Sequence, residues 1–274
     1  VRPHVVSSPP KTNLEHHVRN PLKEKWSAGE ETIGGWLAIA DAFSAEIMGR
    51  VGFDYLCIDM QHGVADYATA IQMMQALESA PHGVPIVRVP WNEPGIIGRM
   101  LDGGSRGVIV PMVNSVAEAE AAVAACRYAP EGSRSWGPVR AMRIHDEYSP
   151  EIANAAVAVI PMIETKQAVD NIDDILSVPG IDAIYVGPAD LSVSLGLPPA
   201  SDHDVGIFTE ALETIVAACR RHGVVPGVHT NPSFIAKRQE QGFQMITVCN
   251  DYLALAQGAK AMLDSGTPDG DATY

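Results

Sequence analysis

The chain alternates between two kinds of segment, short apolar runs and longer amphipathic stretches. The short runs are typical of strands that are buried on both faces of a parallel sheet. The stretches that follow them repeat apolar residues at helical spacing. The expected strands are Thr32–Ile39, Asp54–Met60, Val84–Val89, Gly107–Met112, Ala156–Ile163, Ile181–Val186, Val224–His229 and Met245–Cys249. The expected helices are Asp41–Val51, Asp66–Ser79, Glu93–Gly103, Ser115–Tyr128, Thr165–Ser177, His203–Arg221, Asn231–Gln241 and Asp251–Asp264.

This alternation predicts an α/β protein whose strands are parallel. Repetition over a chain of 274 residues indicates a (β/α)8 TIM barrel, and a doubly wound open sheet is the alternative. A short N-terminal helix between Asn20 and Ala28 precedes the first strand. We therefore expect residues 1–19 to form a flexible arm and residues 20–274 to form a single barrel domain.

One connection is longer than the others, the polar segment from Tyr128 to Asn154. Arg134, Arg140 and Arg143 make it locally basic. Loops of this length are usually functional or held by a partner. Because it leads from a helix to a strand, its root lies on the face opposite the expected active site. We expect it to fold along the barrel or to pack against a neighbouring subunit.

The charge balance excludes some classes of partner. Lys and Arg number 19 against 33 Asp and Glu, a net charge of −14, so neither nucleic acid nor a membrane surface is an expected partner. Apolar stretches long enough to span a bilayer do not occur in the sequence. The 4 cysteines are widely spaced and lack the spacing of metal ligands. Together with an N-terminal stretch that has no signal-peptide core, these features predict a cytoplasmic protein.

Two carboxylates stand at neighbouring strand ends. Glu164 directly follows the run Ala156–Ile163, and Asp190 follows the run Ile181–Val186 after a short turn. A strand–helix–strand unit brings both strand ends to one edge of the sheet. Two buried carboxylates repel each other unless a cation or a proton lies between them, so a divalent metal site is one interpretation. The alternative is that such a carboxylate only caps the next helix, a role that Thr165 can take in place of Glu164.

The segment Gly187-Pro188-Ala189-Asp190 favours the metal site. Gly187 allows a ligand to approach the backbone closely. The N–H groups of Ala189 and Asp190 can receive a substrate carboxylate beside a metal ion.

Further polar residues lie at the carboxyl ends of predicted strands, where barrels of this kind carry their catalytic groups. An interpretation without catalysis exists for each of them: Asp59 and Arg88 can form a buried ion pair, and the histidines can simply line a cavity. The residues concerned are Trp36, Asp59, His62, Arg88 and His229.

Several segments carry a resemblance to a known family: GFDYLCIDMQHG, RVP, GGSRGVIVPMVNSVAEAEAAVAACRYAPEGSRSWGP, PMIET and GPADLSVSLG. From Leu22 to Leu263 the chain resembles the class II 2-oxo acid aldolases of the HpcH/HpaI type. The resemblance implies a divalent-metal barrel that cleaves a 4-hydroxy-2-oxo acid to pyruvate and an aldehyde. It also implies a homo-oligomer, commonly a hexamer.

The resemblance assigns roles to individual residues of this chain. Glu164 and Asp190 match the metal ligands, Arg88 matches the arginine that stabilises the enolate, and His62 with Asp59 matches a His–Asp dyad. There are two departures from the family pattern. Gln61 stands where an acidic residue is common, and Met162 stands where glutamine is frequent, which puts the substrate range in doubt.

The chemistry of retro-aldol cleavage explains these residue types. Cleavage leaves an enolate on the pyruvate fragment, and a chelated metal ion acts as Lewis acid for that charge. Oxygen ligands favour Mg²⁺, Mn²⁺ or Co²⁺. Arg88 adds a permanent positive charge, and His62 is the candidate base for the 4-hydroxyl, with Asp59 orienting its imidazole. Trp36, Gly187, Ala189 and His229 are the further candidates for substrate binding.

Other activities remain open from the sequence. A Schiff-base aldolase is disfavoured because Lys166 and Lys237 lie in predicted helices and not at strand ends. A citrate-lyase-like or malyl-CoA-lyase-like enzyme acting on acyl-CoA is the nearest alternative, although no basic cluster for a CoA phosphate stands out. A barrel that binds oxo acids without turnover is the alternative outside enzymes.

Overall fold

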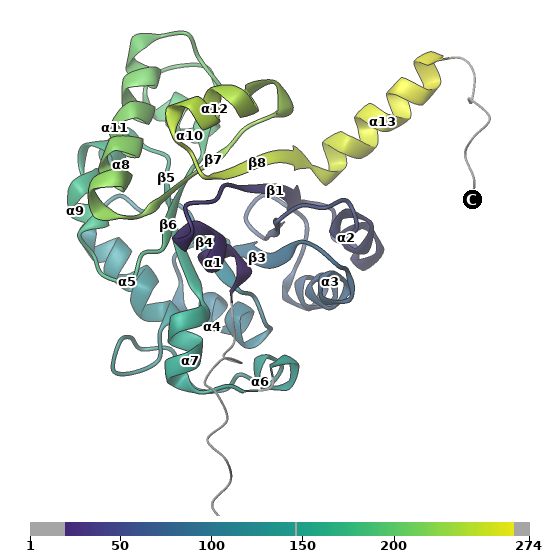
Figure 1. The fold of residues 1–274 in the computed structure, drawn as a ribbon, viewed down its shortest axis with the longest axis vertical. Coiled ribbons are helices and arrows are strands. Elements are labelled where there is room, and N and C mark those ends of the chain that lie inside the picture. The colour runs from purple at the N-terminus through teal and green to yellow at the C-terminus, as the bar shows by residue number, and fades with distance from the viewer. Residues whose placement is uncertain (1–19, 146, 266–274) are drawn as a thin grey trace, which may run out of the picture.

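The computed structural model describes residues 20–145 and 147–265, in which eight parallel strands close into a barrel (Figure 1). Each strand pairs with the next along the chain, and the last pairs with the first. This confirms the predicted (β/α)8 barrel. The strands are β1 (Thr32–Leu37), β2 (Tyr55–Asp59), β3 (Val84–Arg88), β4 (Gly107–Val110), β5 (Ala158–Ile163), β6 (Ala183–Val186), β7 (Val225–His229) and β8 (Met245–Asn250).

The helices surround the barrel (Figure 1). They are α1 (Pro21–Ser27), α2 (Ala42–Gly49), α3 (Tyr67–Ser79), α4 (Pro94–Asp102), α5 (Val116–Cys126), α6 (Ala141–Ile144), α7 (Pro150–Ala156), α8 (Lys166–Asp170), α9 (Ile172–Leu176), α10 (Pro188–Ser194), α11 (Gly206–His222), the 3-10 helix η1 (Pro232–Phe234), α12 (Ile235–Gln241) and α13 (Asp251–Ser265). The described helices are too short or too polar for any of them to cross a bilayer. The predicted N-terminal arm, residues 1–19, lies outside the described residues.

The structure corrects two predicted elements. The single helix expected over Thr165–Ser177 is divided into α8 and α9 at Asn171, whose backbone leaves helical geometry (φ −99°, ψ 11°). The side chain of Asn171 donates to the carbonyl oxygen of Asn114 across 2.8 Å, so a tertiary contact holds the break. An additional short helix, α10, follows β6 and begins with Pro188, whose missing N–H is no loss at a helix start.

Side chains along the strands alternate between two layers. Leu56 and Ile58 of β2 point outward and belong to the apolar layer beneath the helices, whereas Tyr55 and Cys57 fill the barrel interior. Gly34 on β1 is required by this packing, because a Cβ there would lie 2.1 Å from the ring of Tyr55.

Helix α1 closes the amino-terminal end of the barrel. Its buried Leu22 and Trp26 pack with the interior residues of the strands. Asn20 caps this helix, since its side chain accepts the backbone N–H of Leu22. The predicted N-terminal helix is therefore confirmed, and it covers the amino-terminal end of the barrel interior.

Contacts with the barrel of the same chain hold the long connection between α5 and β5. Two short helices, α6 and α7, interrupt it. Arg134 donates to Asp102 at 2.7 Å and Arg140 pairs with Glu78. Of the two expected arrangements, folding along the barrel is the one that these contacts show.

Helix α13 extends away from the barrel (Figure 1). Of its residues only Asp251, at the start, is buried, and Leu255, Met262 and Leu263 are exposed. Helix α11, of similar length, instead buries an apolar stripe. The last helix predicted by the alternation is therefore present, but it does not cover its own strand in the way the others do.

Candidate active site

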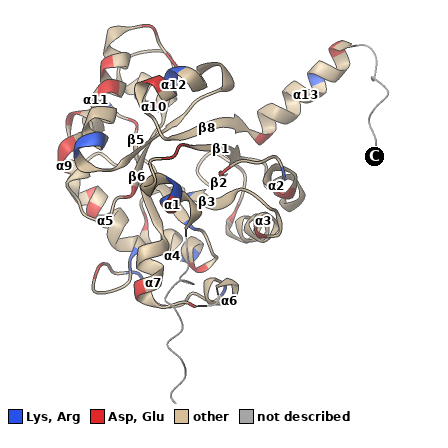
Figure 2. Ribbon diagram, viewed as in Figure 1, with Lys and Arg blue, Asp and Glu red and all other residues tan. Residues whose placement is uncertain are grey.

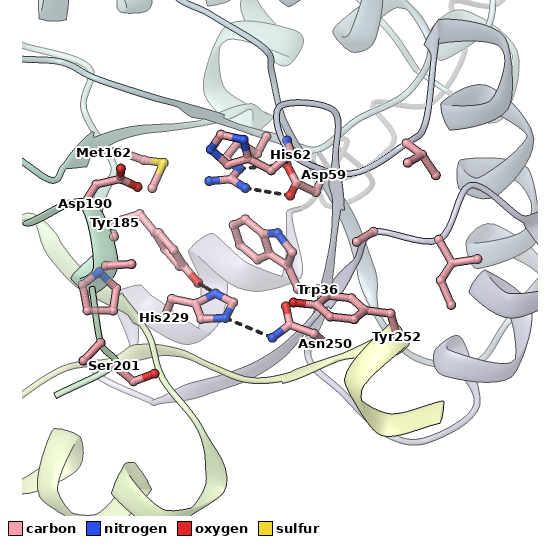
Figure 3. A pocket seen from close by; sticks show the side chains of 18 residues that line it. Trp36, Asp59, His62, Met162, Tyr185, Asp190, Ser201, His229, Asn250 and Tyr252 are labelled. Carbon is pink, nitrogen blue, oxygen red and sulfur yellow. Dashed lines mark hydrogen bonds and ion pairs between the residues drawn. The ribbon is translucent and has the colours of Figure 1, made fainter. Parts of the chain in front are cut away.

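A cavity of about 590 Å³ opens at the carboxyl ends of the strands (Figure 3). Nearly all the residues predicted from strand ends line it: Trp36, Asp59, His62, Arg88, Gly187, Ala189, Asp190 and His229. Glu164 lies directly behind this lining. A Cβ on Gly187 would approach the Oε2 atom of Glu164 to 2.5 Å, so the glycine leaves room for the carboxylate at the cavity wall.

Glu164 is a buried carboxylate at the end of β5, with an exposed fraction of 2%. Its Oε1 atom accepts the backbone N–H of Met112 at 2.8 Å. Burial, and to a smaller extent the charge of Asp190, raise its pKa to about 7. The cap of α8 is Thr165, whose hydroxyl accepts the N–H of Ala168. The alternative in which Glu164 only caps a helix is thus wrong.

Met112 was not predicted as a site residue. It has a left-handed backbone (φ 57°), which is uncommon for a residue other than glycine and which directs its N–H toward Glu164. Asn114 stabilises this conformation, because its side chain donates to the carbonyl oxygen of Met112 at 2.9 Å and bonds the hydroxyl of Thr165. No sequence pattern identifies such a residue, because a methionine after a strand looks like ordinary apolar sequence.

Asp190 lies in the first turn of α10 and is exposed. It lies beside Met162 at the cavity wall (Figure 3). The two carboxylates are close enough for Asp190 to act on the pKa of Glu164. The structure therefore brings together Glu164 and Asp190, which the strand–helix–strand argument placed in one volume.

Asp59 and Arg88 form a buried bidentate ion pair. Nε donates to Oδ1 at 2.9 Å and an Nη atom donates to Oδ2 at 2.6 Å. Burial acts to raise the pKa of Asp59, but the hydrogen bonds and charge of Arg88 outweigh it and hold the pKa below its ordinary value. The guanidinium carbon also lies 5.0 Å from the centre of the Trp36 ring. The pairing that the sequence left open is thus present.

His62 is an exposed residue on the loop after β2, and its side chain lines the cavity. Asp59 was expected to orient its imidazole. In the described residues the Asp59 carboxylate instead accepts the backbone N–H groups of Gln61 at 3.0 Å and His62 at 3.3 Å. Asp59 therefore shapes the loop that carries His62 and does not bond the ring.

His229 lies in a buried aromatic and polar cluster. The Tyr185 hydroxyl donates to the hydroxyl oxygen of Thr247 at 2.6 Å and lies 3.2 Å from Nδ1 of His229. The side chain of Asn250 lies 3.3 Å from Nε2. The Tyr185 oxygen then accepts from Nδ1–H, and Nε2 accepts from the Asn250 amide.

Both ring nitrogens of His229 are thus engaged. Burial lowers its pKa to about 4, with a smaller contribution from the charge of Arg88, so the ring is neutral at neutral pH. Trp36 stacks on Tyr185 at 5.3 Å between ring centres. Tyr185, Thr247 and Asn250 were not predicted, because their neighbours across the barrel are set by strand register.

A divalent metal fits the two carboxylates. Oε2 of Glu164 has no hydrogen bond from any described residue, and Glu164 and Asp190 provide hard oxygen donors. Among residues 20–145 and 147–265, no cluster of three or more His, Cys, Asp or Glu suited to a metal occurs. Two protein ligands with the remaining positions left to water and substrate are typical of magnesium sites and not of structural zinc sites.

Comparisons with known proteins agree with this geometry. The profile of the HpcH/HpaI aldolase/citrate lyase family matches residues 32–257. The 4-hydroxy-2-oxo-heptane-1,7-dioate aldolase of Salmonella typhimurium is 37% identical over 249 residues, which cover 89% of this chain and 94% of that protein.

Solved structures give the same result. An HpcH/HpaI aldolase/citrate lyase family protein from Burkholderia cenocepacia superposes with a TM-score of 0.83 at 31% identity, covering 90% of this chain and 99% of that one. The citrate synthase SbnG superposes with a TM-score of 0.79 at 33% identity, covering 92% and 99%. The citrate lyase beta subunit of Mycobacterium tuberculosis, complexed with oxaloacetate and magnesium, shares the fold at 16% identity and a TM-score of 0.54, covering 83% and 95%.

Proposed function

Because this chain belongs to the HpcH/HpaI aldolase/citrate lyase family and is a carbon–carbon lyase, we propose that it is a metal-dependent class II aldolase. Its reaction is the reversible cleavage of a 4-hydroxy-2-oxo acid to pyruvate and an aldehyde. The observation that carries the proposal is the arrangement of Glu164 and Asp190 at one mouth with the buried Arg88. The substrate class follows the name of the Salmonella relative.

Glu164 and Asp190 would hold the metal ion, which we propose to be Mg²⁺, Mn²⁺ or Co²⁺. When bound, the ion supplies Lewis-acid stabilisation for the oxyanion that develops on the 2-oxo acid. The magnesium in the solved citrate lyase beta subunit supports this choice. Gly187 and the N–H of Ala189 would receive the substrate carboxylate beside it.

The chain's own residues supply the remaining chemistry. Arg88, fixed by its bidentate bond to Asp59, presents a permanent positive charge to the enolate oxygen. An imidazole nitrogen of His62 accepts the proton of the 4-hydroxyl, directly or through a water molecule. Trp36 and the neutral His229 form a wall that orients the substrate and excludes water from the developing charge.

The lysines support a mechanism without a Schiff base. Lys166 pairs with Asp170 on the exposed surface of α8, and Lys237 pairs with Asp202 beside α12. Neither lines the cavity at the strand ends. The related activity of the citrate synthase SbnG keeps bond formation on a citrate-like acid as the second candidate.

We also propose a cytoplasmic homo-oligomer, with the hexamer of the resembling aldolases as the expected state. The apolar residues Leu255, Met262 and Leu263, exposed along α13, support association of copies of this chain. The mass in solution, measured by light scattering, would decide the number of subunits.

The activity is tested by incubating the protein with pyruvate, a divalent metal and a panel of aldehydes. Formation of 4-hydroxy-2-oxo acids with Mg²⁺ or Mn²⁺, and its loss after chelation, is the expected result. Turnover of oxaloacetate with acetyl-CoA but not of pyruvate with any aldehyde would instead support the citrate-forming candidate. A Glu164→Ala variant that keeps full activity in metal-free buffer would contradict the proposed metal site.

A further inference from the structure

The cavity has two chemically different ends (Figure 3). Met162 and Asp190 lie on one side, and Asn250 and Tyr252 lie across from them. The lining beyond the proposed pyruvate site is mostly apolar: Trp36, Ala38, Ile39, Val64, Ala200 and Tyr252, with Ser201 and Asn250 as uncharged polar residues. An aldehyde that reacts with a pyruvate enolate at the carboxylate side would extend its chain along this lining.

Arg88 is the one Lys or Arg among the described residues that line the cavity. Two of its donors are taken by the bidentate bond to Asp59, and both side chains are buried. In the proposed reaction its remaining donors face the pyruvate enolate. A second carboxylate at the far end of a substrate would therefore find no free positive charge from Arg88.

The histidines do not supply that charge either. Both nitrogens of His229 are engaged by Tyr185 and Asn250. The only other imidazole of the lining belongs to His62. In the proposed reaction it exchanges its proton with the 4-hydroxyl oxygen at the reacting carbon, so it does not pair with a carboxylate at the far end of the aldehyde.

Cations behind the cavity wall are also paired. Arg238 donates to the carbonyl oxygen of Ser201, a lining residue, but it is 0% exposed and its charge is taken by Asp202 at 2.8 Å. Lys237 pairs with the same carboxylate. Among the described residues near this wall, the positive charges are thus used for structure.

Met162 makes the side of the cavity that carries Asp190 more apolar. It is 2% exposed and lines the cavity, and its Cε atom would lie 3.0 Å from a Cβ on Gly187. The thioether offers no hydrogen-bond donor and only a weak acceptor. It contributes shape and no polar contact to a substrate lying against the carboxylate side.

We propose that the aldehyde partner of this enzyme is uncharged, with an aliphatic or aromatic chain, and that aldehydes carrying a second carboxylate are discriminated against. This inference rests on the proposed aldolase function. A carboxylate held against this lining would have no ion-pair partner among the lining residues of this chain. The 1,7-dioate named for the Salmonella relative carries such a second carboxylate, so this chain is expected to differ from it.

The test compares succinate semialdehyde with 4-methylpentanal. The two aldehydes have similar shapes, and 4-methylpentanal carries an isopropyl group in place of the carboxylate. With pyruvate and Mn²⁺, we expect kcat/KM to be about tenfold or more higher for 4-methylpentanal. Equal values, or a preference for the semialdehyde, would overturn the inference.

A separate measurement distinguishes this failure from failure of the proposed function. Exchange of the pyruvate methyl protons in D₂O with Mn²⁺ reports enolate formation without any aldehyde. If exchange occurs and the semialdehyde is preferred, the substrate inference is wrong and the aldolase chemistry stands. If no exchange and no adduct are observed, the proposed function itself is wrong.

A matched pair of variants tests whether charge is the cause. Val64 lines the cavity and is 78% exposed, so a long side chain there should not disturb folding. Val64→Lys should raise kcat/KM for succinate semialdehyde about threefold over Val64→Gln, its neutral counterpart of similar length, because a partly screened ion pair is worth that much. An unchanged ratio would show that charge does not set the preference and would overturn the inference.

Discussion

The two sides of the active-site cavity differ in whether their buried charges have ion-pair partners in the protein. On the carboxylate side, Glu164 is buried beside Asp190 and receives a single backbone N–H from Met112. On the paired side, formed by Asp59, Arg88 and His229, the carboxylate bonds the guanidinium and both imidazole nitrogens have protein partners. Among the described residues of these two sides, the carboxylates without an ion-pair partner are Glu164 and Asp190, where a cation is proposed to bind; Figure 3 shows Asp190 at the cavity.

This difference teaches where function and stability reside. The bidentate bond and the bonds of His229 hold the paired side in its shape without a ligand. On the carboxylate side, the charges of Glu164 and Asp190 repel each other, and a bound dication can remove this repulsion. Acidic residues of the chain are spread over the helices (Figure 2), so this repulsion is a local feature.

The largest effect should come from the carboxylate side. Glu164→Gln removes the charge of one proposed metal ligand and should lower kcat for retro-aldol cleavage roughly ten thousand-fold, since Lewis-acid stabilisation contributes several kcal/mol. The thermal midpoint of the metal-free protein should not fall. Glu120→Gln, on the exposed face of α5, is the control and should keep activity. Full activity of Glu164→Gln would refute the metal role of this side.

The next effect should come from breaking the paired side. Asp59→Asn leaves the buried Arg88 without its counter-charge and should reduce the free energy of unfolding by about 4 kcal/mol. Urea denaturation measures this. The same substitution in an exposed ion pair, Asp170→Asn, should cost less than about 1 kcal/mol. Equal losses in the two variants would mean that burial of the Asp59–Arg88 pair has no special weight.

The two sides should also respond oppositely to pH. The folded pKa of Glu164, about 7, lies above the ordinary 4.5, so the metal-free protein should lose stability as pH rises from 4.5 to 7. The folded pKa of His229, about 4, lies below the ordinary 6.5, so stability should fall as pH decreases from 6.5 to 4. Each contribution is about 3 kcal/mol over its window.

Unfolding measured from pH 4 to pH 8 without metal separates these contributions. The two windows overlap, so the two contributions largely cancel in the wild-type protein. Glu164→Gln should leave a stability that falls as pH decreases from 6.5 to 4, and His229→Gln should leave a stability that falls as pH rises from 4.5 to 7. Saturating Mn²⁺ should stabilise the wild-type protein most above pH 7, where Glu164 is ionised. Identical pH profiles for both variants and wild type would contradict the contrast between the sides.

The smallest effect should come from the loop that supports Glu164. Asn114→Ala removes the bonds to Met112 and Thr165 and should weaken Mn²⁺ binding about tenfold, because the partners that orient a ligand tune metal affinity. Titration calorimetry measures this. Asn92→Ala removes a comparable bond, to the carbonyl oxygen of Glu118, and should leave Mn²⁺ affinity unchanged. If both variants bind alike, Met112 does not position Glu164.

Much of the fold could be predicted because the apolar periods are local properties of the chain. The run before Glu164 and the turn containing Gly187 identify two strand ends, and βαβ connectivity then brings Glu164 and Asp190 together. The break at Asn171 could not be predicted, since it depends on a bond to Asn114 from another loop. The same holds for the left-handed Met112.

The sequence by itself determined the closed barrel, because the alternation of strands and helices is set along the chain. It also determined the strand ends and the types of side chain at the mouth, because polar residues follow the apolar runs. The packed structure alone decided which charges are paired: that Arg88 bonds Asp59, that both nitrogens of His229 are engaged, and that Glu164 is not neutralised by the protein. The physical reason is that pairing and desolvation depend on distances across the barrel, which strand register and loop conformation set.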